Sequence, residues 1–188
     1  MLKVKIILGS TRAGRQGDKP AQFVHTLAKE RADWEVELLD LKEWDMPLAM
    51  SAKPPKSGEY DDEMTKKWAA VIGEADAYII VTPEYNHGYP AVLKNALDRI
   101  YNEWLNKPVA FVGYGAMLGG GRAVEQLRQV AIELQMAPIR EAVFVPLVWQ
   151  AFDESGKPAN EQLTAGAQVM FAQLTWWGEA LKAAREKK

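Results

Sequence analysis

The feature that most constrains the fold of this 188-residue chain is a regular alternation of strand-like and helix-like segments from its first residues to its last. Five short segments have strand-like patterns. Residues 3–9, 77–82, 108–113 and 139–148 are mostly apolar, whereas residues 34–40 alternate acidic and apolar side chains. Parallel strands are joined by crossovers of about a dozen residues or more, normally helices. The alternation therefore predicts an α/β protein whose five-stranded parallel sheet is covered by helices on both faces.

The segments between these strands carry apolar residues at helical spacing. They lie at residues 20–28, 64–75, 90–105, 124–134 and 163–181. Residues 41–61 contain three prolines and a glycine, so we expect a long loop there. No repeat or low-complexity linker interrupts the pattern, and the length suits one domain, so we expect residues 1–188 to form a single domain.

The helix expected after Pro90 is apolar around an unusually wide arc. Its apolar side chains are Val92, Leu93, Ala96, Leu97, Ile100, Tyr101, Trp104 and Leu105. At about 3.6 residues per turn they cover roughly half of the helix circumference, whereas a helix on a sheet needs a stripe of little more than ~100°. The excess predicts a second apolar contact, and we expect a homodimer or homotetramer. The alternative is that the long loop or the last helix covers this surface.

Composition narrows the chemistry that such a fold can carry. The chain has no cysteine, which excludes disulfides, iron–sulfur clusters, thiol nucleophiles and cysteine zinc sites. With His25 and His87 as the two histidines, we expect no metal centre. Redox chemistry in this chain would therefore need a bound organic cofactor. The net charge of −2 and the lack of a long basic run argue against nucleic acid as a partner.

The distribution of apolar residues predicts a protein that does not enter membranes. The densest apolar stretches, such as residues 77–81, are far shorter than the ~20 residues needed to span a bilayer. Met1 leads directly into a strand-like segment, without the basic and apolar regions of a signal peptide. We expect a soluble, cytoplasmic protein with no membrane partner.

The first of three candidate loops joins the first strand to the first helix. Residues 9–17 read Gly-Ser-Thr-Arg-Ala-Gly-Arg-Gln-Gly. Ser10 and Thr11 offer hydroxyl groups, Arg12 and Arg15 add charge, and the helix that follows directs the positive end of its dipole at the loop. This combination suits a terminal phosphate, although the loop is neither a P-loop nor a dinucleotide-binding pattern. The alternative is a surface turn with two solvated arginines.

The second loop, residues 82–90, follows the third strand and reads Thr-Pro-Glu-Tyr-Asn-His-Gly-Tyr-Pro. Tyr85 and Tyr89 offer aromatic surface to a planar ring, and the side chain of Asn86 can pair with a pyrimidine edge. The alternative is a rigid turn whose tyrosines pack on the core. We interpret His87 as a surface histidine rather than a catalytic acid.

The third loop, residues 113–122, follows the fourth strand and is rich in glycine. It begins like a dinucleotide fingerprint, but Leu118 stands where the third glycine belongs. Glycines permit close approach of the backbone to a flat ligand. The alternative is that they shape a tight strand-to-helix connection. Ligands of open parallel sheets bind at the carboxyl ends of the strands, so all three loops lie where binding is expected.

Taken together, these loops resemble the NADPH-dependent FMN reductase family, a branch of the flavodoxin-like proteins. The resemblance covers residues 3–148, and its most specific parts are residues 81–86 (Val-Thr-Pro-Glu-Tyr-Asn) and 90–98, with Gly-Ser-Thr-Arg at residues 9–12. It implies a flavodoxin-like three-layer sandwich with strand order 2-1-3-4-5. It also implies FMN as cofactor and NAD(P)H as co-substrate.

The resemblance also implies which residues hold the cofactor. The phosphate would lie against Ser10, Thr11, Arg12, Arg15, Gln16 and Gly17; the isoalloxazine would lie against Pro83, Glu84, Tyr85 and Asn86; and Tyr114 and Gly115 would close the far side. One departure concerns Asp18, because many members have serine and asparagine at the end of the phosphate loop. We expect Asp18 to cap the first helix and point away, with Arg15 and backbone amides replacing the missing hydroxyl.

The function implied is electron transfer from NAD(P)H through bound FMN to a small acceptor such as a flavin, a quinone, an azo compound or a metal ion. The flavin carries this chemistry, so we expect no catalytic side chain. A flavodoxin-type electron carrier and a non-catalytic flavin-binding protein remain as alternatives. A hydrolase that uses Ser10 as nucleophile is disfavoured, because His87 is the sole histidine in a strand-end loop. The preference between NADH and NADPH stays open.

Overall fold

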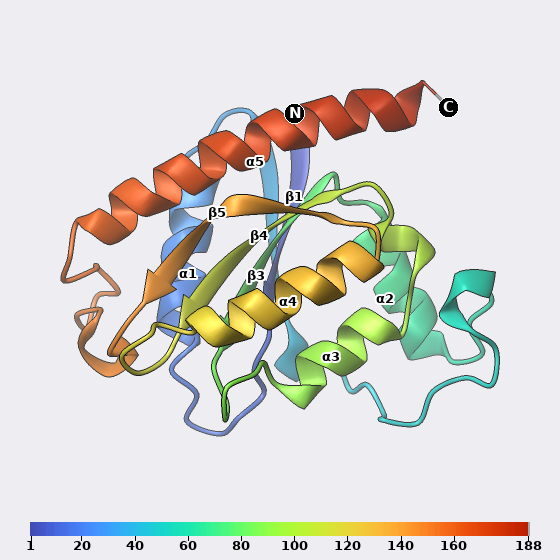
Figure 1. Cartoon of the computed structure of the whole chain (residues 1–188), viewed down its shortest axis with the longest axis horizontal. Coiled ribbons are helices and arrows are strands. Elements are labelled where there is room, and N and C mark those ends of the chain that lie inside the picture. The colour runs from blue at the N-terminus through green and yellow to red at the C-terminus, as the bar shows by residue number, and fades with distance from the viewer. Residues whose placement is uncertain (188) are drawn as a thin grey trace.

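The computed structural model describes residues 1–187, and it contains one parallel sheet with strand order β2-β1-β3-β4-β5 (Figure 1). The strands are β1 Leu2–Leu8, β2 Trp34–Asp40, β3 Ala77–Pro83, β4 Pro108–Tyr114 and β5 Ala137–Val145. The helices are α1 Asp18–Lys29, α2 Glu63–Gly73, α3 Ala91–Asp98, α4 Gly121–Glu133 and α5 Gln162–Glu186. The predicted flavodoxin-like order is confirmed.

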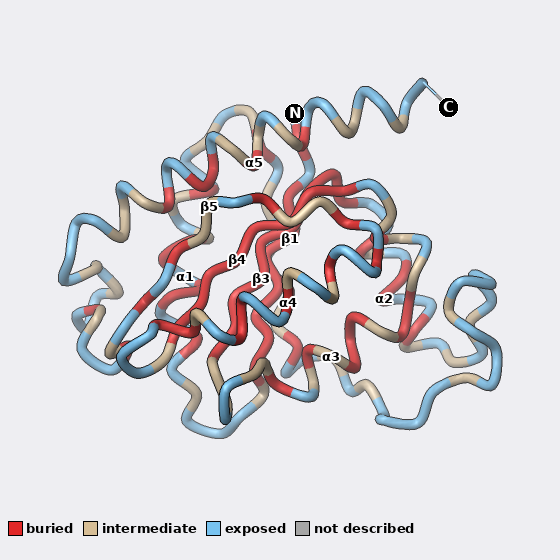
Figure 2. Tube along the Cα trace, viewed as in Figure 1, coloured by how far each residue is buried: buried red, intermediate tan, exposed pale blue. Residues whose placement is uncertain are grey.

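The sheet separates two hydrophobic cores, which makes the fold a three-layer sandwich. One core packs α1 and α5 against one face, through residues such as Phe23 and Phe171. The other packs α2, α3 and α4 against the opposite face, through residues such as Trp68 and Leu97. Every residue of β3 and β4 is buried, as expected for central strands covered on both faces, and Figure 2 shows these strands as the buried centre of the molecule.

The helix after Pro90 is shorter than predicted. α3 ends at Asp98, and the chain then turns through a short 3₁₀ helix, Asn102–Trp104. Ile100 and Trp104 are fully buried, and the indole of Trp104 donates to the carbonyl of Leu97 at 3.1 Å. Most of the apolar arc is therefore covered by the core of its own chain, while Val92, Tyr101 and Leu105 stay half-buried.

The last strand also ends earlier than predicted, at Val145 instead of residue 148. Pro146 has no amide hydrogen, and Leu147 adopts the left-handed conformation, with φ +46°. The chain therefore turns sharply and forms a 3₁₀ helix, Val148–Gln150.

The parallel register brings the three loops together at one edge of the sheet. Leu8 pairs with Val81, and Pro83 pairs with Tyr114, so the ends of β1, β3 and β4 are nearly level. The amide of Gly9 donates to the carbonyl of Val81 at 2.8 Å, which extends this pairing into the first loop. Among the described residues, no helix is both long and apolar enough to cross a membrane.

Candidate functional site

A cavity of about 240 Å³ lies where these loops meet. Its lining residues are Arg12, Gly14, Arg15, Gln16, Pro83, Glu84, Tyr85, Tyr114, Gly115, Ala116, Val148 and Trp149. Most of the predicted site residues therefore share one cavity. Ser10 and Gly17 are buried behind it, Thr11 is half-buried, and Asn86 is exposed at the tip of the second loop.

Arg15 holds the first loop together from within. Its guanidinium carries five N–H groups, and each has an acceptor in the structure. Nη1 donates to the carbonyl of Ser10 and to Asp40 Oδ1, both at 2.6 Å; Nε and Nη2 donate to Asp18 Oδ1 at 3.0 and 2.6 Å; and Nη2 also reaches Asp40 Oδ2. Arg15 therefore organises the loop and has no N–H group left for a phosphate.

The charges of Arg15 and Asp40 stabilise each other. The hydrogen bond from Arg15 to Asp40 raises the pKa of Arg15, although burial alone would lower it. Burial opposes charge on Asp40, but hydrogen bonds from Arg15 and from the Lys42 amide outweigh it. The pKa of Asp40 consequently stays below its ordinary value of 3.8.

The expectation that Asp18 caps α1 was wrong. Gly17 is the N-cap residue and makes no side-chain capping bond, while Asp18 is the first residue of the helix. The carboxylate of Asp18 instead accepts two hydrogen bonds from Arg15. An acidic side chain in the first turn interacts favourably with the helix dipole, so Asp18 stabilises the helix start without capping it.

Arg12 is the available cation of the first loop. It is exposed, and within residues 1–187 its guanidinium forms no ion pair. The guanidinium lies 5.9 Å from the centre of the Tyr85 ring, in a cation–π arrangement. The hydroxyl of Tyr85 in turn bonds the hydroxyl of buried Ser10 at 2.8 Å. The first and second loops are thereby joined directly.

The second loop is a tight hairpin turn. Tyr85 and Gly88 exchange backbone hydrogen bonds of 2.8 and 3.1 Å, and Asn86 and His87 both have positive φ, the pattern of a type I′ turn. Tyr89 packs partly against the core below, as the structural alternative predicted for the tyrosines, whereas Tyr85 lines the cavity.

Glu84 ties the second loop to the third. One carboxylate oxygen accepts from the Arg122 amide at 3.0 Å, and the other accepts from the Arg122 guanidinium at 2.8 Å. Burial raises the pKa of Glu84, but both hydrogen bonds from Arg122 outweigh this effect and lower it below the ordinary range. The Glu84 side chain is thus a link between loops, and its amide donates to the carbonyl of Tyr114 at 3.2 Å.

Tyr114 carries a buried hydroxyl that finds no hydrogen-bond partner within the described residues. A buried polar group without a partner is costly, and burial raises the pKa of this hydroxyl well above its usual range. The hydroxyl lies against Gly17, where an added Cβ would approach it to 2.3 Å. The start of α1 therefore needs glycine here to leave room for Tyr114.

Sequence reasoning missed one wall of the cavity. Val148 and Trp149 line it from the turn after β5, and the predicted strand extends into this turn as far as residue 148. The proline at residue 146 was the signal that could have ended the strand earlier, because proline cannot continue a sheet ladder.

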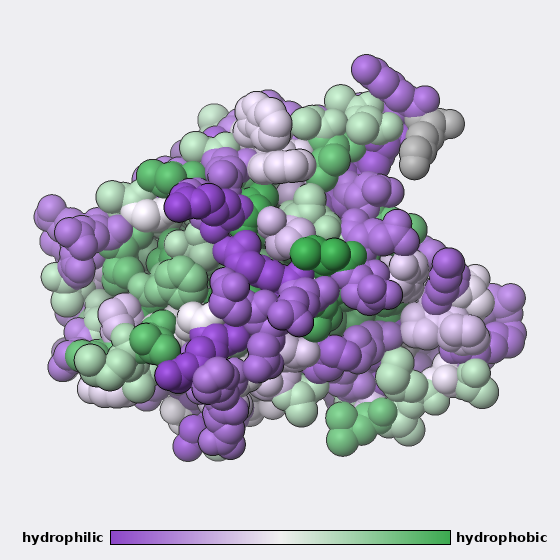
Figure 3. Space-filling model, viewed as in Figure 1, coloured by the Kyte–Doolittle hydropathy of each residue, from purple (hydrophilic) through white to green (hydrophobic). Residues whose placement is uncertain are grey.

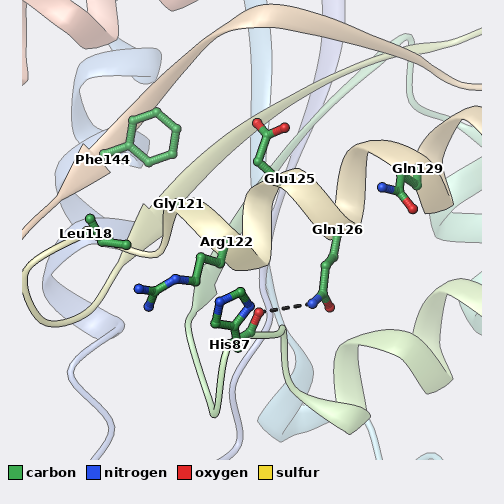
Figure 4. A pocket seen from close by; sticks show the side chains of 8 residues that line it. All are labelled: His87, Leu118, Gly121, Arg122, Glu125, Gln126, Gln129 and Phe144. Atoms are coloured by element: carbon green, nitrogen blue, oxygen red, sulfur yellow. Dashed lines mark hydrogen bonds between the residues drawn. The ribbon is translucent and has the colours of Figure 1, made fainter.

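A second, more open hollow of about 410 Å³ lies on the outer side of α4. It is lined by His87, Leu118, Gly121, Arg122, Glu125, Gln126, Gln129 and Phe144 (Figure 4). Figure 4 shows Leu118 and Phe144 near the start of α4, with His87 and Arg122 below them. In Figure 3, hydrophobic side chains gather at the left of this face, over the end of β5 and the loop before α4.

Sequence comparisons with known proteins agree on the class of protein that this chain resembles. The family described as NADPH-dependent FMN reductase matches residues 2–150. An NAD(P)H-dependent FMN reductase of Schizosaccharomyces pombe is 41% identical over 150 residues, which cover 77% of this chain and 74% of the relative. An NAD(P)H:quinone oxidoreductase of Solanum tuberosum is 29% identical, over 86% of this chain and 85% of that protein.

Solved structures show the same fold. A flavoenzyme NAD(P)H:(acceptor) oxidoreductase from Paracoccus denitrificans superposes with a TM-score of 0.77 at 23% identity, over 95% of this chain and 98% of that chain. A flavodoxin from Pseudomonas aeruginosa superposes with a TM-score of 0.55 at 19% identity, over 90% of this chain and 98% of that one. At these identities the likeness concerns the fold alone.

Proposed function

Because the chain belongs to the NADPH-dependent FMN reductase family and is an FMN-dependent NAD(P)H oxidoreductase, we propose that its FMN binds in the cavity at the ends of β1, β3 and β4. The observation that carries this assignment is the convergence of the three loops on one cavity. The phosphate lies at the first loop, beside Ser10, Thr11, Arg12, Gln16 and Gly17. The ring lies between the second loop, at residues 83–86, and Tyr114 and Gly115.

The residues present fit a phosphorylated flavin. Arg12 supplies a cation that has no ion-pair partner among residues 1–187, and the amino end of α1 supplies a positive dipole. The Tyr114 hydroxyl, which has no hydrogen-bond partner in the described part of the chain, lies beside Gly17 at that helix end, where a phosphate oxygen would satisfy it. Arg15 takes part indirectly, since it fixes the shape of the loop through Asp18 and Asp40.

The protein's part in the reaction is to hold and expose the flavin. When bound, FMN would supply the redox chemistry, namely hydride acceptance from NAD(P)H and electron delivery to an acceptor. The Glu84–Arg122 link and the Tyr85–Gly88 hairpin fix the two loops that flank the ring. We assign no side chain to acid–base catalysis. The names of the relatives support flavins and quinones as electron acceptors. We propose azo compounds and metal ions as further acceptors.

The activity is tested by anaerobic titration of the FMN-loaded protein with NADPH and NADH. We expect complete bleaching of the flavin absorbance in one two-electron step, without long-wavelength absorbance building up. The net charge of −2 is nearly neutral, so the anionic nicotinamide cofactor meets no strongly acidic field. Reduction that needs hours and passes through a stable coloured one-electron form would instead identify an electron carrier.

The phosphate assignment is tested by Arg12→Ala. Charge-assisted hydrogen bonds contribute roughly 1.5–3 kcal/mol each, so the variant should bind FMN about 10-fold more weakly or worse. Riboflavin lacks the phosphate, and its affinity should be nearly unchanged. Equal losses for both ligands, measured by equilibrium dialysis, would place Arg12 away from the phosphate.

We further propose that the protein is a homodimer or homotetramer, with the hollow on α4 as the contact. Leu118 and Phe144, which line this hollow, are 52% and 41% exposed, and Met117, the sequence neighbour of Leu118, is 76% exposed. Clustered exposed apolar side chains mark protein interfaces. Light scattering at micromolar concentration should give a mass of two or more chains, and Phe144→Glu should shift it towards one chain. A wild-type protein that is strictly monomeric contradicts this proposal.

A further inference from the structure

Trp149 is a large aromatic side chain held in the open at the rim of the candidate flavin cavity. It is 60% exposed, although tryptophan is highly buried on average. It lines the same cavity as the first-loop residues Arg12 and Gln16 and the third-loop residue Gly115. The indole thus adds an aromatic wall to a site whose other aromatic surface comes from Tyr85 and Tyr114.

The backbone that carries this indole is rigid. The amide of Leu147 donates to the carbonyl of Ala116 and the amide of Val148 to the carbonyl of Gly115, both at 3.0 Å. Val148 is buried, and the amide of Gln150 donates back to Leu147 at 2.9 Å. The turn after β5 is therefore bound to the third loop at the residues that flank the cavity.

The turn is also strained. Leu147 has φ +46°, a conformation that a branched side chain rarely adopts. Strained residues of this kind persist where the surrounding structure holds them, and they cluster at ligand-binding sites. The turn after β5 thus combines a fixed backbone, local strain and an exposed aromatic side chain. It lies directly beside a cavity whose aromatic lining suits a planar ligand.

From this geometry we propose that Trp149 is a flavin-contacting residue, whose indole stacks against the isoalloxazine ring bound in the cavity. The inference rests on the proposed flavin site. Stacking on an aromatic side chain favours any planar ring and needs no hydrogen bond. Trp149 therefore recognises the ring, in contrast to Arg12, which recognises the phosphate.

This division of roles has a distinct experimental signature. FMN and riboflavin are titrated into the cofactor-free wild type, Trp149→Ala and Trp149→Phe. Dissociation constants are measured by equilibrium dialysis. Trp149→Ala should weaken the binding of FMN and of riboflavin by the same factor, about 10-fold, which corresponds to about 1.4 kcal/mol of binding free energy. Trp149→Phe keeps an aromatic face and should recover most of the affinity.

Trp176 supplies a matched control. It is 65% exposed, lies on α5 and packs edge-on against Trp177, and it does not line the cavity. Trp176→Ala should bind both ligands as the wild type does. Circular dichroism and thermal melting check that each variant is folded.

Three outcomes overturn the inference. They are unchanged affinities in Trp149→Ala, a loss confined to FMN, and a loss that Trp149→Phe does not reverse. Failure of the wild-type protein to bind either ligand would overturn the proposed function as well. A wild type that binds FMN beside a Trp149→Ala variant with unchanged affinity rejects the role of Trp149 alone.

Discussion

Gly120→Ala is expected to destabilise the protein by about 3 kcal/mol or more. Gly120 has φ +85°, a conformation that costs other residues about 1–3 kcal/mol. A Cβ at this position would also lie 2.5 Å from the Tyr114 amide nitrogen and 2.8 Å from the Gly113 Cα. Both atoms belong to the backbone of a central strand, which cannot move aside without breaking its ladder. Urea denaturation measures the loss.

Gly156→Ala separates strain from steric overlap. Gly156 has φ +84°, almost the same as Gly120, but an added Cβ would meet nothing within 4 Å. This control should therefore show only the conformational cost, about 1–3 kcal/mol, and should lose less stability than Gly120→Ala. Equal losses of stability in the two variants would contradict the close packing of the third loop against β4.

Asp40→Asn is expected to lower the free energy of unfolding by roughly 2–3 kcal/mol, because it removes the charge opposite a buried arginine. The Arg15 side chain is 8% exposed and that of Asp40 is 20% exposed. Removing one partner of a fully buried pair costs about 3–5 kcal/mol; the value here is smaller because Arg15 retains Asp18. Asp18→Asn is the control, since the Asp18 side chain is 61% exposed and exposed pairs contribute about 0–1 kcal/mol.

The same pair predicts a pH dependence. The pKa of Asp40 in the folded protein is below its ordinary value of 3.8, so the ionised carboxylate stabilises the fold fully above that value. This contribution is lost as the pH falls below 3.8 and through the folded-state pKa. Between pH 7 and pH 3, the wild type should therefore lose more stability than Asp40→Asn. Parallel losses in the two proteins would show that Asp40 is not held in its charged form.

The parallel sheet was predictable because β1, β3 and β4 are apolar runs that end close to a glycine or a proline, and because β2 alternates acidic and apolar side chains. Strand boundaries for β2 agree with the prediction, while β5 ends three residues before the predicted end. The predicted length of the helix after Pro90 was wrong for a different reason. Ile100 and Trp104 continue a helical spacing, but they reach the core from irregular backbone, and periodicity alone does not distinguish these cases.

Site residues could be predicted where their position follows from the order of strands in the sequence. Their roles could not be predicted where these depend on contacts with residues far away in the sequence. Residues of the three loops could be grouped because the ends of parallel strands meet at one edge. The roles of Arg15 and Glu84 depend on Asp40 and Arg122, which lie 25 and 38 residues away in the sequence. Trp149 enters the cavity through a turn whose geometry depends on the carbonyls of Gly115 and Ala116.

The engagement of every Arg15 N–H group has a thermodynamic consequence for ligand capture. A loop that must order itself on binding loses conformational entropy, and that loss reduces affinity. Here the carboxylates of Asp18 and Asp40 and the carbonyl of Ser10 hold the loop through contacts within the chain itself. These contacts need no ligand, so little ordering cost remains for a phosphate, and its association should involve a small entropy loss.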